Sequence, residues 1–291
     1  IQGDVIVFET PGAIYAAPRI RRHNPTASFI FLDASYRLQG SRAMNLRKFS
    51  SITQMAVRTD RWLDTRLLVW LLNRYFDGVV AISSQVKNQH ERLTNLPTRV
   101  VHPHVPFDWA NELQAIEPDL SSNNVVCLGR DGDYKGFDRL VSEWDQIRQE
   151  IPDAELHLIG RNEEKWYKNV AGVHVHGWVD NLKEELSGMS LGVHPARWDA
   201  LCLATVELML AGIPTIVTET TGSSDYVSSL SQELVTENSR ESIRDQVLWY
   251  LRLEETDRAS LSAQAPSAVS GLVGSESDRL ENILKQLSSS K

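Results

Sequence analysis

The stretch VVCLGRDGDYKGFDRL, residues 125–140, predicts a buried strand followed by a glycine-rich loop and the start of a helix. Its first four residues form a continuous apolar run, which is typical of parallel strands covered on both faces. The loop then carries two cations, Arg130 and Lys135, five residues apart. Because loops after parallel strands lead to helix N-termini that attract phosphate, both cations could converge on one diphosphate. The alternative is an Asp-rich surface turn in which both cations are solvated.

Strand and helix signals alternate along the whole chain, which predicts an α/β protein with doubly wound parallel sheets. Short apolar runs predict strands at 5–8, 29–32, 79–82, 99–101, 125–128, 154–159, 173–176, 190–194 and 215–217. Longer stretches with helical periodicity predict helices near 13–23, 62–76, 84–94, 137–150, 181–187, 203–211, 239–254 and 275–288. The residues that carry function should follow the strands directly.

The 291 residues suffice for about two domains. Residues 103–123 contain three prolines and a polar Ser-Ser-Asn-Asn stretch without sustained periodicity, so we expect a linker at 105–122. An N-terminal domain then occupies 1–104 and a C-terminal domain 123–273, and a helix at 274–291 packs back on the first domain. The chain starts directly at a strand without an initiator Met, and we expect its first domain to be incomplete.

The composition is that of a soluble globular enzyme, with 42% hydrophobic and 23% charged residues. No run approaches the roughly 18 uncharged apolar residues that a membrane span needs. The two cysteines, Cys127 and Cys202, lie 75 positions apart, which predicts neither a disulfide framework nor a zinc knuckle. We therefore expect a reducing, cytoplasmic setting.

The eight histidines do not predict a metal site. His174 and His176 alternate along one predicted strand, and His102 and His104 flank a proline, but no third ligand has suitable spacing. We interpret the histidines as structural and expect no metal ion.

Charge is distributed unevenly along the chain. Residues 1–104 carry 14 Lys and Arg against 7 Asp and Glu, whereas the remainder carries 16 against 31. Residues 36–61 place several of these cations among Met, Leu and Phe side chains, which favours contact with an anionic membrane surface or a lipid-linked acceptor. Nucleic acid is not expected, because no recognition motif or aromatic platform accompanies the charge. We expect a cytoplasmic protein, peripheral on the membrane face.

A second loop between a strand and a helix has the sequence HPARWDALCLATVE, residues 194–207. Asp199 lies in the loop, and Glu207 lies in an apolar helical stretch where an unpaired charge would be costly. Both carboxylates could accept hydrogen bonds from the hydroxyls of a sugar and a ribose. The alternative is that Asp199 caps the helix and Glu207 faces solvent. Two further loops, at 177–181 and 220–225, taken alone predict helix-capping turns.

In their order and spacing these segments resemble the C-terminal domain of glycosyltransferase family 4, which has the GT-B fold, across about residues 123–230. The matching residues are Gly129-Arg130, Lys135-Gly136, Leu158-Ile159-Gly160, Gly177-Trp178-Val179, Pro195, Asp199 followed after seven residues by Glu207, and Ala211-Gly212-Ile213-Pro214. The resemblance implies two Rossmann-like domains that face each other across a cleft. It also implies a retaining transferase that needs no metal ion and no cofactor besides a nucleotide diphosphate sugar as donor.

The resemblance further implies roles for four side chains. Arg130 and Lys135 would hold the donor diphosphate and stabilise its charge as it leaves. Asp199 would contact the transferred sugar, and Glu207 would bind the ribose hydroxyls.

Further donor contacts are implied at the ends of the strands. Val179 and Asp180 would lie near the base, and the backbone of three loop residues would face the sugar and the phosphates. The complete set of implied donor-binding residues is Gly129, Val179, Asp180, Leu201, Cys202 and Leu203. In the N-terminal half, Glu9 and Asp33 follow predicted strands and are the candidates for the acceptor side, although a lone loop Asp is more often a turn residue.

Three positions depart from the family pattern. Asp199 replaces the first Glu, Cys202 stands where the family usually has Gly, and Ala196 replaces the Ser after Pro. These departures keep two alternatives open beside a glycosyltransferase: a nucleotide-sugar-binding subunit without transfer activity, and a GT-B-like epimerase that uses no acceptor. A nicotinamide oxidoreductase is disfavoured, because no Gly-x-Gly-x-x-Gly follows a strand.

Overall fold

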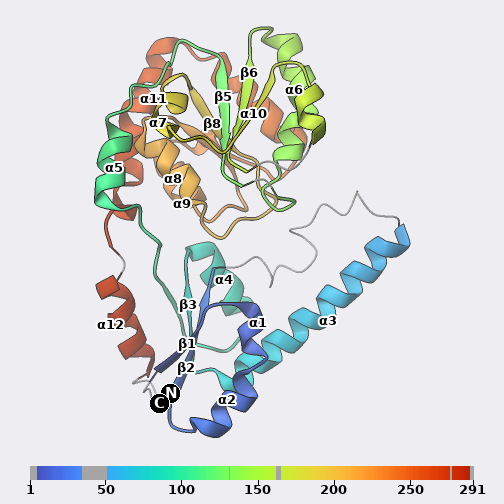
Figure 1. Ribbon diagram of the computed structural model, residues 1–291, viewed down its shortest axis with the longest axis vertical. Helices are drawn as coiled ribbons and strands as arrows, with labels where there is room; N and C mark the ends of the chain where they lie inside the picture. Colours follow the sequence, from blue (N-terminus) through green and yellow to red (C-terminus); the bar gives the residue numbers. More distant parts are fainter. Residues whose placement is uncertain (1–4, 35–50, 131, 162–164, 276, 289–291) are drawn as a thin grey trace. The chain divides into compact units, whose positions relative to one another are not determined.

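The computed structural model describes residues 5–34, 51–130, 132–161, 165–275 and 277–288 (Figure 1). The chain divides into two compact units. Unit 1 comprises Ile1–Pro103 and Ser275–Lys291, and unit 2 comprises His104–Gly274. Unit 1 is therefore built from both ends of the chain and unit 2 from its middle.

In its described residues, unit 1 forms a four-stranded parallel sheet in the order β1-β2-β3-β4. The strands are β1 (Val5–Phe8), β2 (Ser28–Asp33), β3 (Gly78–Ala81) and β4 (Thr98–Val100). The helices are α1 (Pro11–Ile14), α2 (Ala17–His23), α3 (Ser51–Tyr75), α4 (Ser84–Leu93) and α12 (Ser277–Ser288). Each strand lies where the sequence predicts one.

Aromatic side chains fill the core between this sheet and its helices. The rings of Phe8, Phe29 and Phe76 pack with centroids 4.8 to 6.1 Å apart in tilted and edge-on arrangements. Aromatic pairs of this geometry each stabilise a core by about 0.5–1.5 kcal/mol beyond their burial. The apolar runs of β1 and β2 thus contribute Phe8 and Phe29 to the core of unit 1.

The C-terminal helix α12 packs on the sheet of unit 1. Leu287 is buried against Ile30 of β2, Val80 of β3 and Val101. A Cβ atom added at Gly78 would lie 3.0 Å from Leu287 Cδ2, so the glycine makes room for this leucine. The helix expected at 274–291 therefore closes the core of unit 1.

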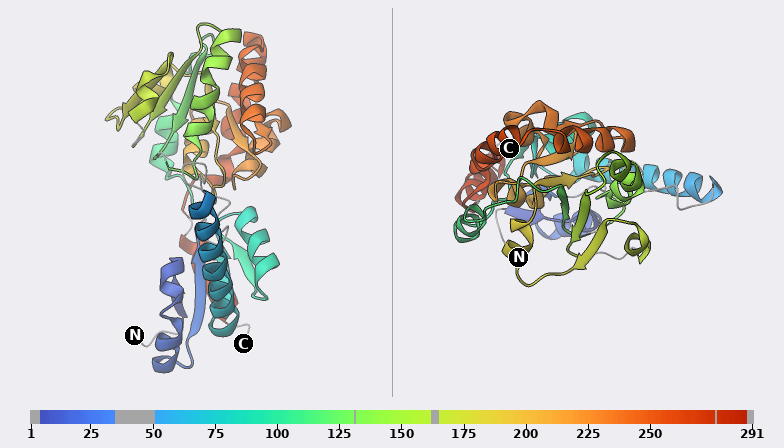
Figure 2. Two further views of the ribbon diagram at one scale, coloured as in Figure 1. Left: turned by 90° about the vertical axis from the view of Figure 1, so that its right-hand side faces the viewer. Right: turned by 90° about the horizontal axis from the view of Figure 1, so that it is seen from above.

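Unit 2 forms a six-stranded parallel sheet in the order β10-β9-β8-β5-β6-β7, with helices on both faces (Figure 2). Its strands are β5 (Asn124–Leu128), β6 (Glu155–Ile159), β7 (Val173–Gly177), β8 (Leu191–His194), β9 (Thr215–Thr218) and β10 (Val235–Thr236). Its helices are α5 (Phe107–Gln114), α6 (Phe137–Glu150), α7 (Leu182–Ser187), α8 (Leu203–Leu210), α9 (Ser224–Leu230), α10 (Arg240–Leu251) and α11 (Glu255–Ala268). Short 3-10 turns lie at η3 (Lys165–Asn169), η4 (Gln232–Leu234) and η5 (Ser270–Leu272).

The strand order of unit 2 reverses beside β5. After β5 the chain adds β6 and β7 on one side, and it then returns to add β8, β9 and β10 on the other. The carboxyl ends of β5 and β8 therefore flank the point at which doubly wound sheets bind their ligands. The loops after these two strands contain the two segments that the sequence singles out.

The expected linker at 105–122 differs from the structure. It contains the helix α5, whose Ala110 and Leu113 are buried in the core of unit 2. Val105 also pairs with Val273, because Val105 N–H donates to Leu272 O at 2.8 Å and Gly274 N–H donates to Val105 O at 2.9 Å. Unit 2 thus begins at the first residues of the expected linker.

The basic segment 36–61 lies mainly outside the described residues. Residues 35–50 are not described, and residues 51–61 are described only as the backbone of the first turns of α3. Among the residues that the structure describes, no helix combines the length and the apolar character needed to span a bilayer.

Candidate functional site

The loops that follow β5 and β8 meet in an ion pair. Lys135 Nζ lies 2.5 Å from Asp199 Oδ2, and both side chains are largely buried. The sequence predicts that Arg130 and Lys135 converge on one diphosphate, which stays a prediction, and the structure gives Lys135 a carboxylate partner. Arg130 lies exposed at the start of the same loop.

A glycine allows the two loops to come this close. Gly136 has φ 74°, and an added Cβ atom would lie 2.1 Å from Pro195 O. Arg197 holds the loops together from the other side, because its guanidinium binds both carboxylate oxygens of Asp138 at 2.8 Å. Its backbone N–H also donates to Tyr134 O at 2.8 Å. Local sequence therefore fixes the position of Lys135 against the β8 loop.

Asp199 is the centre of the site. Its Oδ2 also lies 2.9 Å from His194 Nε2, and Leu201 N–H donates to its Oδ1 at 3.4 Å. Its backbone binds the loop after β9, because Asp199 N–H donates to Thr220 O and Gly222 N–H donates to Asp199 O. The carboxylate is thus buried, hydrogen-bonded and paired with a cation, which satisfies the requirements of a buried charge.

Cys202 begins helix α8 in a left-handed conformation, with φ 67°. It is the single non-glycine residue with positive φ among those the structure describes. A side chain in this conformation costs about 1–2 kcal/mol relative to ordinary helical backbone. The family pattern has Gly at this position, so the structure retains the backbone that the pattern requires although the residue differs.

The charges of these four side chains reinforce one another. Burial disfavours the charge on His194, but the negative charge of Cys202 and the hydrogen bond to Asp199 outweigh it and raise the pKa of His194 to about 9. Burial also opposes the ammonium of Lys135, yet Cys202 and Asp199 raise its pKa. The pKa of Asp199 is lowered despite burial, because His194 and Lys135 stabilise the carboxylate.

The pKa of the Cys202 thiol depends on the same neighbouring charges. Burial would raise its pKa, but the positive charges of His194 and Lys135 lower it. These shifts favour the charged forms of His194, Lys135 and Asp199 and the thiolate form of Cys202 within one buried cluster.

His194, Asp199 and Cys202 each offer one ligand atom, and these atoms lie within 4.8 Å of one another. The ammonium of Lys135 already neutralises the carboxylate of this group, at 2.5 Å from Asp199 Oδ2. A metal ion here would have to displace this ammonium, so we assign the cationic role at this position to Lys135.

Glu207 projects from α8 and is half-buried. Its Oε1 accepts a hydrogen bond from Trp109 Nε1–H at 3.0 Å, and Trp109 belongs to α5. Burial raises the pKa of Glu207, and the bond from Trp109 offsets part of this rise. The sequence reading missed Trp109, because it placed that residue in a linker.

Three glycines lie at the carboxyl ends of β5, β6 and β7. Gly129, Gly160 and Gly177 all have positive φ, and an added Cβ atom at Gly160 would lie 2.3 Å from Gly129 O. Gly160 N–H donates to Gly177 O at 2.7 Å. Val179 and Asp180 follow in the loop after β7, and Leu201 and Leu203 flank Cys202 at the start of α8. The predicted donor-binding residues of unit 2 thus follow parallel strands, at the carboxyl ends of these strands.

The predicted acceptor-side residues belong to unit 1. Asp33 is fully buried at the end of β2, and its Oδ2 lies 2.8 Å from His90 Nε2 of α4. Glu9 is exposed after β1. The buried pair gives Asp33 a partner within unit 1, and an acceptor role for both residues stays a prediction.

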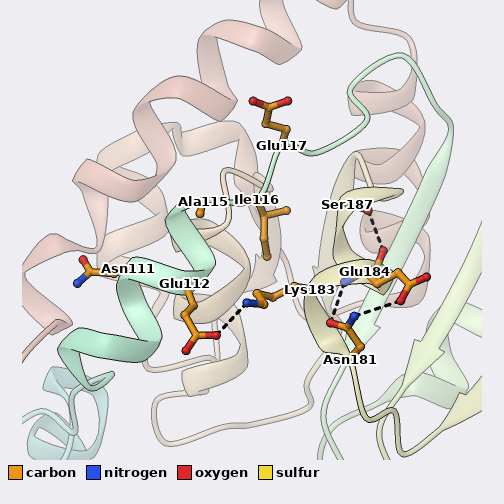
Figure 3. A pocket seen from close by; sticks show the side chains of 9 residues that line it. All are labelled: Asn111, Glu112, Ala115, Ile116, Glu117, Asn181, Lys183, Glu184 and Ser187. Atoms are coloured by element: carbon orange, nitrogen blue, oxygen red, sulfur yellow. Dashed lines mark hydrogen bonds and ion pairs between the residues drawn. The ribbon is translucent and has the colours of Figure 1, made fainter.

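A wide groove of about 880 Å³ lies elsewhere on unit 2, between α5 and α7 (Figure 3). It is crossed by an ion pair of 3.0 Å between Lys183 and Glu112. None of the predicted site residues lines it. Its open walls do not offer the convergent buried charges of the Lys135 cluster.

The two units, each built on a parallel sheet covered by helices, have the architecture of the GT-B fold. Residues 122–252, which make up most of unit 2, match the family model described as "Glycosyl transferases group 1".

Curated relatives agree with this assignment. The chain is 26% identical over 180 residues to the lipopolysaccharide core biosynthesis mannosyltransferase LpsB of Rhizobium meliloti, a match that covers 56% of this chain and 51% of LpsB. It is also 24% identical over 164 residues to an uncharacterized glycosyltransferase of Haemophilus influenzae, covering 51% and 45% of the two chains. The chain thus spans about half the length of the curated relatives it matches.

Solved structures share the fold at low identity. HepE of Anabaena, in complex with UDP, superposes with a TM-score of 0.68 and 15% identity over 98% of this chain and 79% of HepE. WaaG, a glycosyltransferase involved in lipopolysaccharide biosynthesis, gives a TM-score of 0.64 and 14% identity over 88% and 77%. Both likenesses show the GT-B fold.

Proposed function

We propose that this protein transfers a glycosyl group from a nucleotide diphosphate sugar to a glycan or lipid-linked acceptor, with retention of the anomeric configuration. The observation that carries the proposal is the buried pair of Lys135 and Asp199, formed by the loops after β5 and β8. These loops lie where a doubly wound sheet of this kind binds its ligand.

The geometry supports separate roles for the two cations and for Asp199 in the donor site. In the free protein the ammonium of Lys135 is held by Asp199, and a donor diphosphate would attract the same ammonium. Together with Arg130, Lys135 would stabilise the negative charge that develops on the departing diphosphate, without a metal ion. Asp199 would then be available to accept a hydrogen bond from a sugar hydroxyl.

The remaining donor contacts follow from α8. Glu207 is oriented by the indole of Trp109, and it would accept hydrogen bonds from the ribose hydroxyls. The N-terminus of α8, at Cys202 and Leu203, would present backbone N–H groups to the phosphates. Val179 and Asp180 would lie near the base.

Related proteins support the choice of ligands. Structures of HepE contain UDP and UDP-glucose, which supports a nucleotide sugar as donor. LpsB and WaaG are named for lipopolysaccharide biosynthesis, which supports an acceptor from that class of surface glycan. A first test is a thermal-shift panel of nucleotide sugars, because a ligand that binds only the folded protein raises its melting temperature.

The decisive variant is Lys135→Ala. Loss of this charge should lower the turnover of sugar transfer by about 100-fold or more, as loss of one preorganised contact to a developing anion does. The matched control is Lys183→Ala, an exposed lysine of the same unit that pairs with Glu112 outside the site. Equal transfer rates in wild type and Lys135→Ala would contradict the proposed role.

Product analysis separates the proposal from the two alternatives. Incubation with donor and acceptor should yield a glycosylated acceptor whose anomeric configuration matches the donor. An epimerised sugar nucleotide formed from donor alone would indicate an epimerase. Donor binding without transfer or hydrolysis across a broad acceptor panel would indicate a binding subunit.

We also propose that residues 36–61 and the following turns of α3 contact an anionic membrane surface. The apolar side chains of Leu63, Leu67 and Trp70 are exposed on α3, with Arg66 among them. Cations beside exposed apolar groups favour binding to anionic lipid interfaces. Sedimentation with vesicles should show binding that rises with anionic lipid and falls with salt. Binding that is indifferent to both would exclude this contact.

A further inference from the structure

Three histidines share one face of the outer strands of unit 2, which form the yellow-green margin of the sheet in Figure 2. His157 of β6 is the register partner of His174 on the edge strand β7. His176 lies at a shift in the register of β6 and β7, and its ring contacts that of His157. The sequence alone offered only two of these residues at a recognisable spacing, because the third comes from a neighbouring strand.

Two of the ring nitrogens are already at the spacing of metal ligands. His157 Nδ1 and His176 Nε2 lie 3.0 Å apart. Two imidazole nitrogens bound to one tetrahedral zinc ion, each about 2.0–2.1 Å from the metal, are separated by about 3.3 Å. The ring of His174 stacks on His157 with centroids 5.0 Å apart, and its side chain is 52% exposed. His174 is therefore the imidazole that stands beside this pair on the same face.

Carboxylates hold the outer nitrogens of two of these rings. Glu185 Oε2 lies 3.2 Å from His176 Nδ1, which directs Nε2 of that ring toward His157. Glu155 Oε2 lies 2.6 Å from His174 Nε2. A carboxylate on the second ring nitrogen is the arrangement that orients metal-binding histidines and raises their basicity.

The surroundings leave room for an ion. A shallow pocket of about 400 Å³ is lined by His174 and His176 together with Lys168 and two valines of β7. The remaining nitrogen of His157, Nε2, is buried without a hydrogen-bond partner among the described residues. The charge of Glu155 is shared with Arg148 at 2.6 Å, so the local charge is close to balanced before a cation binds.

We propose that His157, His174 and His176 form a binding site for a divalent transition metal ion of the imidazole-preferring class, such as zinc or cobalt(II). His157 Nδ1 and His176 Nε2 are its preformed ligands, His174 supplies the third, and Glu185 orients His176. The site is separate from the Lys135 cluster, because its side chains stand on β6 and β7 rather than on the loops after β5 and β8.

Zinc titration of the full chain by calorimetry tests the proposal. We expect one zinc site in the wild type, and at least 100-fold weaker binding in the double variant His157→Gln/His176→Gln. Glu185→Gln should weaken zinc binding by about 10–100-fold, which is the usual effect of removing a carboxylate behind a metal-bound histidine. His23→Gln, an exposed histidine of α2, is the matched control and should bind zinc as the wild type does. Unchanged zinc binding in the double variant would overturn the proposal.

A spectrum with cobalt(II) distinguishes this site from the other group of metal-binding residues. Cobalt held by imidazoles should give weak visible bands without a strong near-ultraviolet thiolate band. An intense near-ultraviolet band that disappears in Cys202→Ser would place the metal at Cys202 and overturn the proposal. Should the double variant fail to fold, as judged by thermal unfolding without metal, the single variant His174→Gln replaces it, since that side chain is exposed and its loss should still weaken zinc binding by about 10-fold or more.

Discussion

At the scale of single residues, His194 is the member of the Lys135 cluster whose titration falls in an accessible range. Its pKa is raised to about 9 by Cys202 and Asp199, against the effect of burial. A group with a raised pKa in the folded state contributes stability that is complete below its unfolded pKa of about 6.5 and is lost as the pH rises through 9. The shift corresponds to about 3 kcal/mol.

This predicts a pH-dependent effect of His194→Asn. The variant should be less stable than wild type by about 3 kcal/mol at pH 6, and the difference should shrink markedly between pH 6.5 and pH 9. Urea unfolding of both proteins across this range measures it. His23→Asn, at an exposed position, serves as control and should show no such trend. A difference that stays constant up to pH 9 would contradict the charged state assigned to His194.

Trp109 makes a second prediction at this scale. Trp109→Phe keeps an aromatic ring on α5 but removes the hydrogen bond to Glu207. A buried acceptor that loses its donor costs about 1–3 kcal/mol, and we expect donor affinity to fall by about 10-fold as the carboxylate loses its orientation. Calorimetric titration with the nucleotide sugar found in the thermal-shift panel measures the change. Trp249→Phe is the control, since Trp249 stands on α10 and packs on the core of unit 2. Identical affinities in Trp109→Phe and wild type would show that Trp109 is not a positioning residue.

At the scale of elements, the junction of the β5 and β8 loops depends on one glycine. Gly136 combines a positive φ with an approach to Pro195 O that no Cβ atom allows. Gly136→Ala should therefore lower the free energy of unfolding by more than about 2 kcal/mol and displace Lys135. Chemical denaturation measures this, and Gly271→Ala is a matched control because no atom lies within 4 Å of its added Cβ. Equal stability of the two variants would contradict the tight junction.

The sequence predicted every described strand except the two-residue β10, because buried apolar runs bounded by turn residues leave little choice of structure. Helix α5 was missed because it spans only two turns, follows Pro106 and lies among polar residues that resemble a linker. Motif order predicted the loops after β5 and β8 as the donor site, and the structure pairs Lys135 with Asp199 across these loops. Their role in donor binding stays a prediction. The hydrogen bond of Trp109 and the meeting of three histidines could not be predicted, because they depend on helix packing and on strand register.

At the scale of the whole molecule, unit 1 depends on both ends of the chain. Leu287 of α12 is buried against Ile30 and Val80 of its sheet. Leu287→Ala should destabilise unit 1 by about 2–5 kcal/mol through the cavity that it leaves, while unit 2 keeps its stability. Unfolding monitored by residue-specific hydrogen exchange separates the two units. Asn282→Ala on the exposed side of the same helix is the control. Loss of protection spread equally over both units would contradict this independence.

The pairing of Val105 with Val273 has an architectural consequence. The chain enters and leaves unit 2 at residues that are hydrogen-bonded neighbours. Unit 2 is therefore a continuous domain inserted between the two chain segments of unit 1. An inserted domain whose ends adjoin can be expressed on its own, or circularly permuted through a short linker, without a change in its strand order. Such a unit could be exchanged between proteins of this fold while the sheet of unit 1 keeps its own strands and helices.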